Sequence, residues 1–346
     1  MAKPTLQDIA KLAGVSSSTV SLVLSNKGKI SPEVQEKVRL AAEEIGYSKT
    51  VPVAGSISNI VAVLFHFDHQ LAQTWHILRQ VTLSLERTLS DMNYLTTLIP
   101  ITFHMTDSEI FRKIVDSRAA AVISMHFGRE DLFARFEKSG LPVVLVINSH
   151  FQSHFYTVCA DNFQGSYEAA SHLLDLGHKR IVYADFDIYE LPATLSDRYF
   201  GFYKALNERG ISFPDGLKLH FDIDDLSDIR QKMETIFSME EKPTAIFFVD
   251  DYLAAHCIGV LDDMGLRIPE DVSIVASGEV LDYDEPYVPK VSGMITRPDL
   301  LGKFSAEMLI DRLEHKHLES YVLKIKQQFV DRGSAVRFMG DESVDK

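Results

Sequence analysis

Four side chains near the N-terminus, three serines and a leucine, are spaced so that one helix face would present them together. Ser17, Ser18, Ser21 and Leu22 stand at offsets of one, four and five residues, which is a single face at 3.6 residues per turn. Serine hydroxyls donate and accept hydrogen bonds, and leucine can contact a thymine methyl group, so this face matches base-pair edges in a major groove. Any one of these residues alone is more typical of solvated surface; the four together predict a DNA-reading face.

Two short helices joined by a tight turn would place this face outward. Thr5 and Asp8 have the spacing of a capping box, so a helix begins here. Gly14 interrupts the apolar pattern, Ser16 can cap a second helix, and a third begins at Ser31–Pro32 with proline at its first position. The inward positions of the three helices are Leu6, Ile9, Ala10, Ala13, Val20, Val23, Leu24, Val34, Val38, Ala41, Ala42 and Ile45. The first two helices form a predicted helix-turn-helix.

The loop after the second helix and the distribution of charge also favour DNA binding at the N-terminus. Asn26, Lys27 and Lys29 in this loop can bind phosphates, which sets register without reading sequence. Residues 1–49 carry seven Lys and Arg against five Asp and Glu, a balance of +2, whereas the whole 346-residue chain carries −14, so the remainder carries −16. Phosphates repel so acidic a body, so DNA contacts are expected only in residues 1–49. The expected DNA-binding residues are Thr5, Ser16, Ser17, Ser18, Thr19, Ser21, Leu22, Asn26, Lys27 and Lys29.

The rest of the composition argues against membrane and secreted classes of protein. No apolar run approaches the ~18 residues that a membrane span requires, and no signal-peptide core follows Met1. The two cysteines, Cys159 and Cys257, are far apart in the sequence, which suits a reducing compartment, and we expect both to be buried. The expectation is a soluble cytoplasmic protein without a membrane partner.

Sequence motifs of enzymes and metal sites give no support for catalysis. The patterns G-x-G-x-x-G, G-x-x-x-x-G-K-[ST] and G-x-S-x-G do not occur. His66-Phe67-Asp68-His69 and His315-Lys316-His317 have no matched third ligand nearby in the sequence, so we interpret them as surface histidines. We therefore expect neither an enzyme nor a bound cofactor or metal.

From residue 60 onward, short apolar runs alternate with amphipathic stretches, the pattern of parallel sheets covered by helices. The predicted strands are residues 60–65, 95–101, 119–125, 143–148, 180–186, 217–221, 245–250 and 272–277. They fit two similar sheets, so the fold class is α/β. Ligands of such architectures bind beyond the carboxyl ends of the strands, here between two lobes.

The segment from Thr5 to Asn26, T-L-Q-D-I-A-K-L-A-G-V-S-S-S-T-V-S-L-V-L-S-N, closely resembles the headpiece of the lactose/galactose repressor (LacI/GalR) family. In that family the positions of Ser17, Ser18 and Leu22 read bases, and its prototype has larger polar groups there, which implies a different operator. The resemblance continues through C-A-D-N-F-Q-G, S-D-R-Y-F-G-F, P-T-A-I-F-F-V-D-D and G-L-R-I-P-E-D-V-S-I-V, so it covers nearly the whole chain.

This resemblance implies a headpiece followed by a two-lobed body similar to a periplasmic sugar-binding protein, with chain crossings near Ala160, Val291 and Ser320. The implied parts are the headpiece at 1–49, a linker at 50–58, an N-terminal lobe of 59–160 with 291–319, and a C-terminal lobe of 161–290 with 320–340.

The linker departs from the family. Most members carry a short helix with an Ala-Arg-x-Leu motif whose leucine wedges into the minor groove and kinks the DNA. Here the sequence from Ser48 is S-K-T-V-P-V-A-G-S-I-S, with Pro52 and Gly55, which is a poor helix former. We expect an extended or flexible linker without the wedge, in which Val51 or Val53 either substitutes for the leucine or is an ordinary linker residue.

The resemblance also nominates effector-binding residues. Arg198 occupies the family position whose guanidinium contacts the effector, and Asp250 or Asp251 after a predicted strand could accept from a ligand hydroxyl, although Asp251 could instead cap the next helix. Trp75 occurs where family aromatics stack on the ligand, with core packing as the alternative. Asn148 ends a predicted strand and is explained equally well as a turn asparagine.

One departure concerns the sugar itself. After V-S-I-V the family commonly has Gly-aromatic-Asp-Asp, whose first Asp binds sugar, whereas this chain reads Ala276-Ser277-Gly278-Glu279. Either Glu279 compensates from one position later, or the effector is changed or lost.

The resemblance thus implies a transcriptional regulator, most simply a repressor. It would bind a palindromic double-stranded DNA operator as a homodimer and respond to a small-molecule, sugar-like effector between its lobes. The alternative is a regulator of the same fold that responds to a partner protein or to no ligand.

Overall fold

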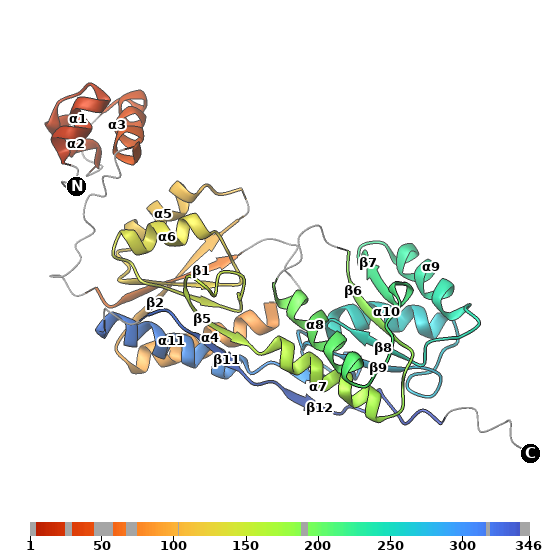
Figure 1. Cartoon of the computed structure of the whole chain (residues 1–346). Coiled ribbons are helices and arrows are strands. Elements are labelled where there is room, and N and C mark those ends of the chain that lie inside the picture. The colour runs from red at the N-terminus through yellow and green to blue at the C-terminus, as the bar shows by residue number, and fades with distance from the viewer. Residues whose placement is uncertain are drawn as a thin grey trace, which may run out of the picture.

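The computed structural model describes residues 5–24, 30–44, 58–66, 75–102, 104–187, 193–315 and 319–339. Its first unit is a group of three helices, α1 (Leu6–Ala13), α2 (Ser17–Leu24) and α3 (Pro32–Glu44) (Figure 1). Seven of the expected inward residues are buried together between the helices: Ile9, Ala10, Val20, Val23, Val38, Ala41 and Ala42. The linker expected at 50–58 lies outside the described residues except for Ser58.

Local hydrogen bonds explain where these helices begin and end. Thr5 caps α1: its hydroxyl accepts from the Asp8 amide at 3.4 Å, and the Asp8 carboxylate accepts from the Thr5 amide at 2.7 Å. Gly14 ends α1 in the left-handed region at φ 66°, which favours glycine. The Ser16 hydroxyl then accepts from the Thr19 amide at 3.0 Å. The capping box and the predicted turn are confirmed.

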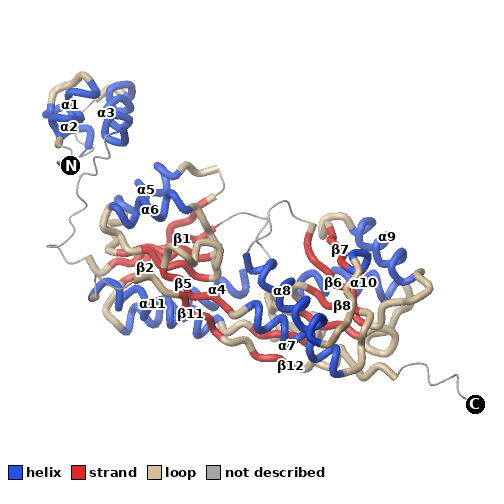
Figure 2. The backbone as a smooth tube through the Cα atoms, in the orientation of Figure 1, coloured by secondary structure: helices blue, strands red, loops and turns tan. Residues whose placement is uncertain are grey.

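The body consists of two six-stranded sheets (Figure 2). The first has the order β11-β5-β4-β3-β1-β2, and its strands are β1 (Ile60–His66), β2 (Leu95–Ile101), β3 (Ala121–Met125), β4 (Val143–Val146), β5 (Tyr156–Ala160) and β11 (Val322–Ile325). The second has the order β12-β10-β9-β8-β6-β7, with β6 (Ile181–Phe186), β7 (Lys218–Phe221), β8 (Ala245–Phe248), β9 (Ser273–Ala276), β10 (Ser292–Ile295) and β12 (Gln328–Val330). All strand pairs are parallel except β10 with β12.

Helices cover both faces of each sheet, which is why the central strands are largely apolar on both faces. Along β1, Val61 and Val63 face the core shared with α4 (Trp75–Asp91) and α11 (Pro298–Glu314). Ala62 and Leu64 face the core shared with α5 (Asp107–Asp116) and α6 (Glu130–Lys138), on the opposite side in Figure 1. The second sheet is covered in the same way by α7 (Asn162–Asp175) and α8 (Ala193–Glu208) on one face, and by α9 (Leu226–Phe237) and α10 (Asp251–Asp263) on the other.

All eight predicted strands are present, with ends that differ by up to two residues. The sheets also correct two of the expected lobe boundaries. The chain crosses between lobes after Ala160, as expected, but next after Ile295 and then after Ile325, instead of near Val291 and Ser320. The physical reason is strand pairing: β10 pairs with β9 of the second sheet, and β11 pairs with β5 of the first. None of the described helices is long and apolar enough to cross a membrane.

One glycine sets how closely the two helices below the first sheet approach. A Cβ atom at Gly302 of α11 would lie 2.4 Å from the Val81 carbonyl oxygen and 2.7 Å from the Leu85 nitrogen, both backbone atoms of α4. Backbone cannot rotate away as a side chain can, so α11 and α4 can pack at this distance only with glycine at position 302.

We predict opposite effects for alanine at two helical glycines. Gly302→Ala forces α11 away from α4 and should lower the free energy of unfolding by about 1–3 kcal/mol. Gly259→Ala in α10 is the matched control, because nothing lies within 4 Å of its added methyl group, and it should raise the free energy of unfolding by up to about 1 kcal/mol. Urea unfolding of both variants measures this difference; equal effects would contradict the packing argument.

Candidate DNA-binding face and effector site

The outward side of α2 carries the predicted reading face. Ser17, Ser18, Ser21 and Leu22 are exposed, with 40% of Leu22 accessible, whereas Val20 and Val23 of the same helix are buried against α1 and α3. The fold thus leaves a large aliphatic side chain exposed to water beside three hydroxyls. This is the arrangement that the sequence predicted for contacting base edges.

Other predicted DNA-binding residues occupy the edge of this face or lie outside the described residues. Thr5 and Ser16 are exposed caps of α1 and α2, and the Ser16 and Thr19 hydroxyls lie 2.8 Å apart. Capping leaves their oxygens near the first turns of the two helices, where amides of a helix N-terminus favour an anion such as phosphate. Asn26, Lys27 and Lys29 lie outside the described residues.

In the body, Arg198 of α8 is a buried arginine, with 7% of its surface accessible. Its Nε donates to Asn162 Oδ1 at 3.1 Å, and its Nη1 donates to the Val249 carbonyl at 2.8 Å. Asn162 is the first residue of α7, directly after the first lobe crossing, and Val249 follows β8. Burial lowers the pKa of the guanidinium, and the Asp250 carboxylate opposes this effect. The guanidinium therefore joins the first crossing to a strand end.

The missing side chain at position 278 makes room for this guanidinium. A Cβ atom at Gly278 would lie 2.4 Å from Arg198 Nη2 and 2.6 Å from its Cζ. Gly278 stands at the position where the family resemblance places the sugar-binding Asp. The arginine thus occupies space that a carboxylate side chain at 278 would need.

The two adjacent carboxylates after β8 have distinct structural roles. Asp250 caps α10, accepting from the Leu253 amide at 2.9 Å. Asp251 instead accepts from the amides of Val280 and Leu281, at 2.8 and 3.4 Å. The cap is therefore Asp250 and not Asp251. Burial raises the pKa of both, and with the repulsion from Asp250 it raises that of Asp251 to about 7.

Glu279 forms an ion pair with Arg332, whose guanidinium lies 3.7 Å from the centre of the Tyr283 ring. Burial raises the pKa of the Glu279 carboxyl, and Arg332 partly offsets this. A ligand that used this carboxylate in place of the missing one would have to compete with Arg332 for it.

The two candidates in the first lobe differ in character. Trp75 begins α4, is partly exposed, and meets Phe65 edge-on with ring centres 5.2 Å apart. Asn148 follows β4; its amide nitrogen donates to the Phe127 carbonyl at 3.0 Å, and its oxygen accepts from the His150 amide at 3.0 Å. These bonds are those of a turn asparagine, which was the alternative interpretation.

The chain matches two family models, one for each part. Residues 5–49 match the model described as bacterial regulatory proteins, lacI family, and residues 170–335 match that described as a periplasmic binding protein-like domain. The chain thus combines a lacI-family DNA-binding domain with a periplasmic binding protein-like domain. It is 28% identical over 347 residues to the HTH-type transcriptional repressor PurR of Aliivibrio salmonicida (strain LFI1238), covering 95% of this chain and 98% of that protein.

Solved structures of transcriptional regulators share the fold of this chain. The transcriptional regulator CelR in complex with cellobiose has a TM-score of 0.68 at 23% identity, covering 96% of this chain and all of that chain. The lac repressor dimer bound to operator and the anti-inducer ONPF has a TM-score of 0.67 at 19% identity, covering 97% of this chain and all of that chain. The expected α/β fold and DNA-binding regulatory function are confirmed.

The structure of the regulator adds buried polar residues that sequence reasoning did not nominate. Asp185, next to last in β6, is buried, and burial raises its pKa. The Tyr183 hydroxyl two residues earlier is buried without a hydrogen-bond partner among the described residues. A carboxylate at the end of a predicted apolar strand was the available signal for Asp185. Asn162 had no such signal, because its partner Arg198 is 36 residues away.

The interpretation of His66 as a surface residue is wrong. His66 ends β1, is buried, and stacks on Phe127 with ring centres 5.8 Å apart. His315 is exposed and lies 3.0 Å from Asp311, while residues 67–69, 316 and 317 lie outside the described residues. The described residues contain no group of three or more potential metal ligands. Both cysteines are buried.

We predict a pH dependence of stability carried by Asp251. Its pKa rises from 3.8 in the unfolded chain to about 7 in the folded one, so the folded state takes up a proton that the unfolded state lacks between these values. The resulting stabilisation is complete below pH 3.8 and is lost as pH rises through 7. Relative to Asp251→Asn, the regulator should therefore lose about 2 kcal/mol of unfolding free energy between pH 5.5 and 8.

Urea unfolding at a series of pH values measures this difference. Asp271→Asn is the matched control, because Arg267 lowers the pKa of Asp271 to about 2, which lies outside the window. A difference between wild type and Asp251→Asn that stays constant from pH 5.5 to 8 would contradict the assignment.

Proposed function

We propose that this regulator is a homodimeric repressor that reads a palindromic operator through α2 and responds to a carbohydrate-like effector bound between its lobes. The observation that carries the DNA half of the proposal is the exposed row of Ser17, Ser18, Ser21 and Leu22, opposite the buried Val20 and Val23. The fold holds this row rigidly, because the same helix is part of a closed three-helix core.

Exposed leucines at an open sheet edge support the homodimer. β2 is the last strand of the first sheet, and Leu95 and Leu98 on it are 61% and 52% exposed. Leu83 on the neighbouring α4 is also exposed. An apolar sheet edge in water is a site for pairing with another chain. A second copy would bury it and place two headpieces on an inverted repeat, as two-fold symmetry requires.

Hydrogen-bonding groups at strand ends support a small polyhydroxylated effector. Arg198, Asp250 and Asp185 lie at or near the carboxyl ends of strands in the second sheet, where ligands of parallel sheets bind. A guanidinium fork is suited to pairs of hydroxyls, and a solved relative holds cellobiose. We propose regulation without catalysis and a cytoplasmic location, in keeping with relatives that are transcriptional repressors.

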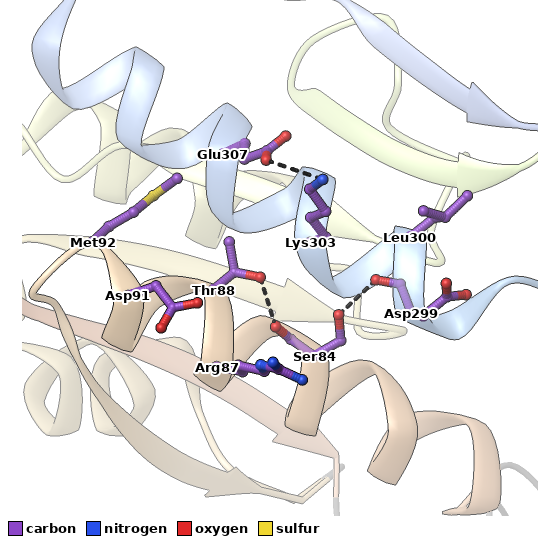
Figure 3. A pocket seen from close by; sticks show the side chains of 9 residues that line it. All are labelled: Ser84, Arg87, Thr88, Asp91, Met92, Asp299, Leu300, Lys303 and Glu307. Atoms are coloured by element: carbon purple, nitrogen blue, oxygen red, sulfur yellow. Dashed lines mark hydrogen bonds and ion pairs between the residues drawn. The ribbon is translucent and has the colours of Figure 1, made fainter.

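One observation favours the alternative of a partner protein. A pocket of about 420 Å³ lies between α4 and α11, away from Arg198, and Figure 3 shows charges of both signs around it. Arg87 and Asp91 come from α4, and Lys303, which lies 3.8 Å from Glu307, comes from α11. Meanwhile Arg198, Asp250 and Glu279 all have partners within the chain. If a partner protein bound at this surface pocket controlled the regulator, these three side chains would not have to bind a ligand.

Selection of random double-stranded DNA on the purified protein, followed by sequencing, tests the DNA half of the proposal. The expected result is an inverted repeat. Leu22→Ala should lower affinity for the selected operator by about 1–3 kcal/mol, because a contact to a thymine methyl is lost. Leu40→Ala, at an exposed leucine of α3, is the matched control and should bind as wild type does. Equal affinity of both variants, or a selected sequence without symmetry, would refute this proposal.

Isothermal titration with sugars, nucleosides and sugar phosphates tests the effector half. We expect saturable binding of a carbohydrate, weakened about tenfold or more, or ~1.4 kcal/mol, by Arg198→Lys, since lysine lacks the planar fork. Arg209→Lys, just beyond the other end of α8 where Arg209 pairs with Asp175, should bind as wild type does. Thermal unfolding confirms that both variants are folded. Silence with every compound would favour the partner-protein alternative.

A further inference from the structure

A charged contact joins the two lobes away from the chain crossings. Asp282 Oδ2, in the loop between β9 and β10 (residues 277–291, the β9–β10 loop), lies 3.0 Å from His76 Nδ1 and 3.9 Å from Arg79 Nη2. His76 and Arg79 are three residues apart on α4, so they share one helix face. α4 belongs to the first lobe and the β9–β10 loop to the second, so this contact depends on how the lobes are placed.

The imidazole is held in an orientation that suits the contact. His76 Nε2 contacts the amide nitrogen of Gln80, one turn along α4. With Gln80 donating to Nε2, the proton of the neutral ring is on Nδ1 and points to Asp282. The side chains of His76 and Asp282 are only 21% and 30% exposed, so solvent screens their attraction less than it screens an open surface pair. Arg79 is more exposed and adds a positive charge near Asp282.

The β9–β10 loop is braced so that Asp282 moves with the second lobe. Asp251 accepts from the amides of Val280 and Leu281, the two residues before Asp282. Arg332, which follows β12, pairs with Glu279 at the start of the loop and donates to the Val291 carbonyl at its end, at 2.9 Å. Both ends of the loop are thus tied to the second lobe. Rotation of one lobe away from the other would break the contact at Asp282 and leave the loop intact.

We propose that His76 and Asp282 form a latch that stabilises the lobe arrangement seen here. A contact that exists in one arrangement and is absent in others shifts the equilibrium toward the first by its own free energy. The latch therefore determines how far the equilibrium between lobe arrangements already favours this one before an effector binds. Its link to DNA affinity rests on the proposed function, but its action on the lobes does not.

Distances between spin labels test the latch in the full chain. Glu86→Cys on α4 and Glu270→Cys in the second lobe are exposed positions, and the native cysteines are buried. In this background, Asp282→Asn and His76→Ala should each move the distance distribution toward longer or broader values. The charge-swapped pair, His76→Asp with Asp282→His, should restore the original distribution, which a merely structural role of either residue would not predict.

Two comparisons make the result decisive. Arg230→Gln removes the Arg230–Asp263 pair between α9 and α10, which lies within one lobe, and should leave the distribution unchanged. On operator binding, a double-mutant cycle at positions 76 and 282 should show coupling of about two- to fivefold. A distribution identical in wild type and Asp282→Asn would overturn the latch. A changed distribution without coupling would support the latch and contradict the proposed link from lobes to headpiece.

Discussion

The organisation of the second lobe depends on a buried guanidinium. A charge removed from water needs hydrogen-bond partners, because an unpaired one costs several kcal/mol. Arg198 meets this requirement with Asn162 at the first crossing and the Val249 carbonyl after β8. Its own carbonyl accepts from Ser166 of α7 at 2.6 Å. One side chain thereby fixes α8, the start of α7 and a strand end relative to each other.

The burial of the Arg198 guanidinium also explains the residues at positions 278 and 250. The plane of the guanidinium needs space that any side chain at 278 would fill. Asp250 supplies a compensating negative charge and is itself stabilised by capping α10. Arg198 and Asp250, which the sequence nominated as separate ligand-binding residues, compensate each other's charge. An effector that enters here exchanges hydrogen bonds with this network instead of finding free groups.

The headpiece was predictable nearly residue by residue because its determinants are local. The Thr5–Asp8 cap, the left-handed Gly14 and the Ser16 cap each act within four residues. The eight predicted strands were recognisable because burial on both faces demands long apolar runs. β10, with the sequence S-G-M-I, and β12, with three residues, have no such run and are specified by pairing with distant strands.

The partners of the site residues could not be predicted because they are distant in the sequence. Sequence order identified strand ends but not partners: Glu279 meets Arg332, 53 residues away, and Asp251 meets Val280, 29 residues away. The roles of Asp250 and Asp251 depend on a loop that packs against them from elsewhere in the chain. His66 looked like part of a polar loop, yet it is the last residue of a buried strand.

The three crossings between the lobes are very short. One residue separates β5 from α7, and two residues separate β10 from α11 and β11 from β12. Gln327 in the third crossing donates to Thr296 in the second at 3.4 Å, so these two are fastened together. A residue spans at most about 3.6 Å when extended, so such tethers cannot lengthen to let the lobes slide or separate. The internal movement left to this protein is a rotation about an axis through the tethers. Any signal that passes from the lobes to the headpiece must therefore depend on the angle between the two lobes.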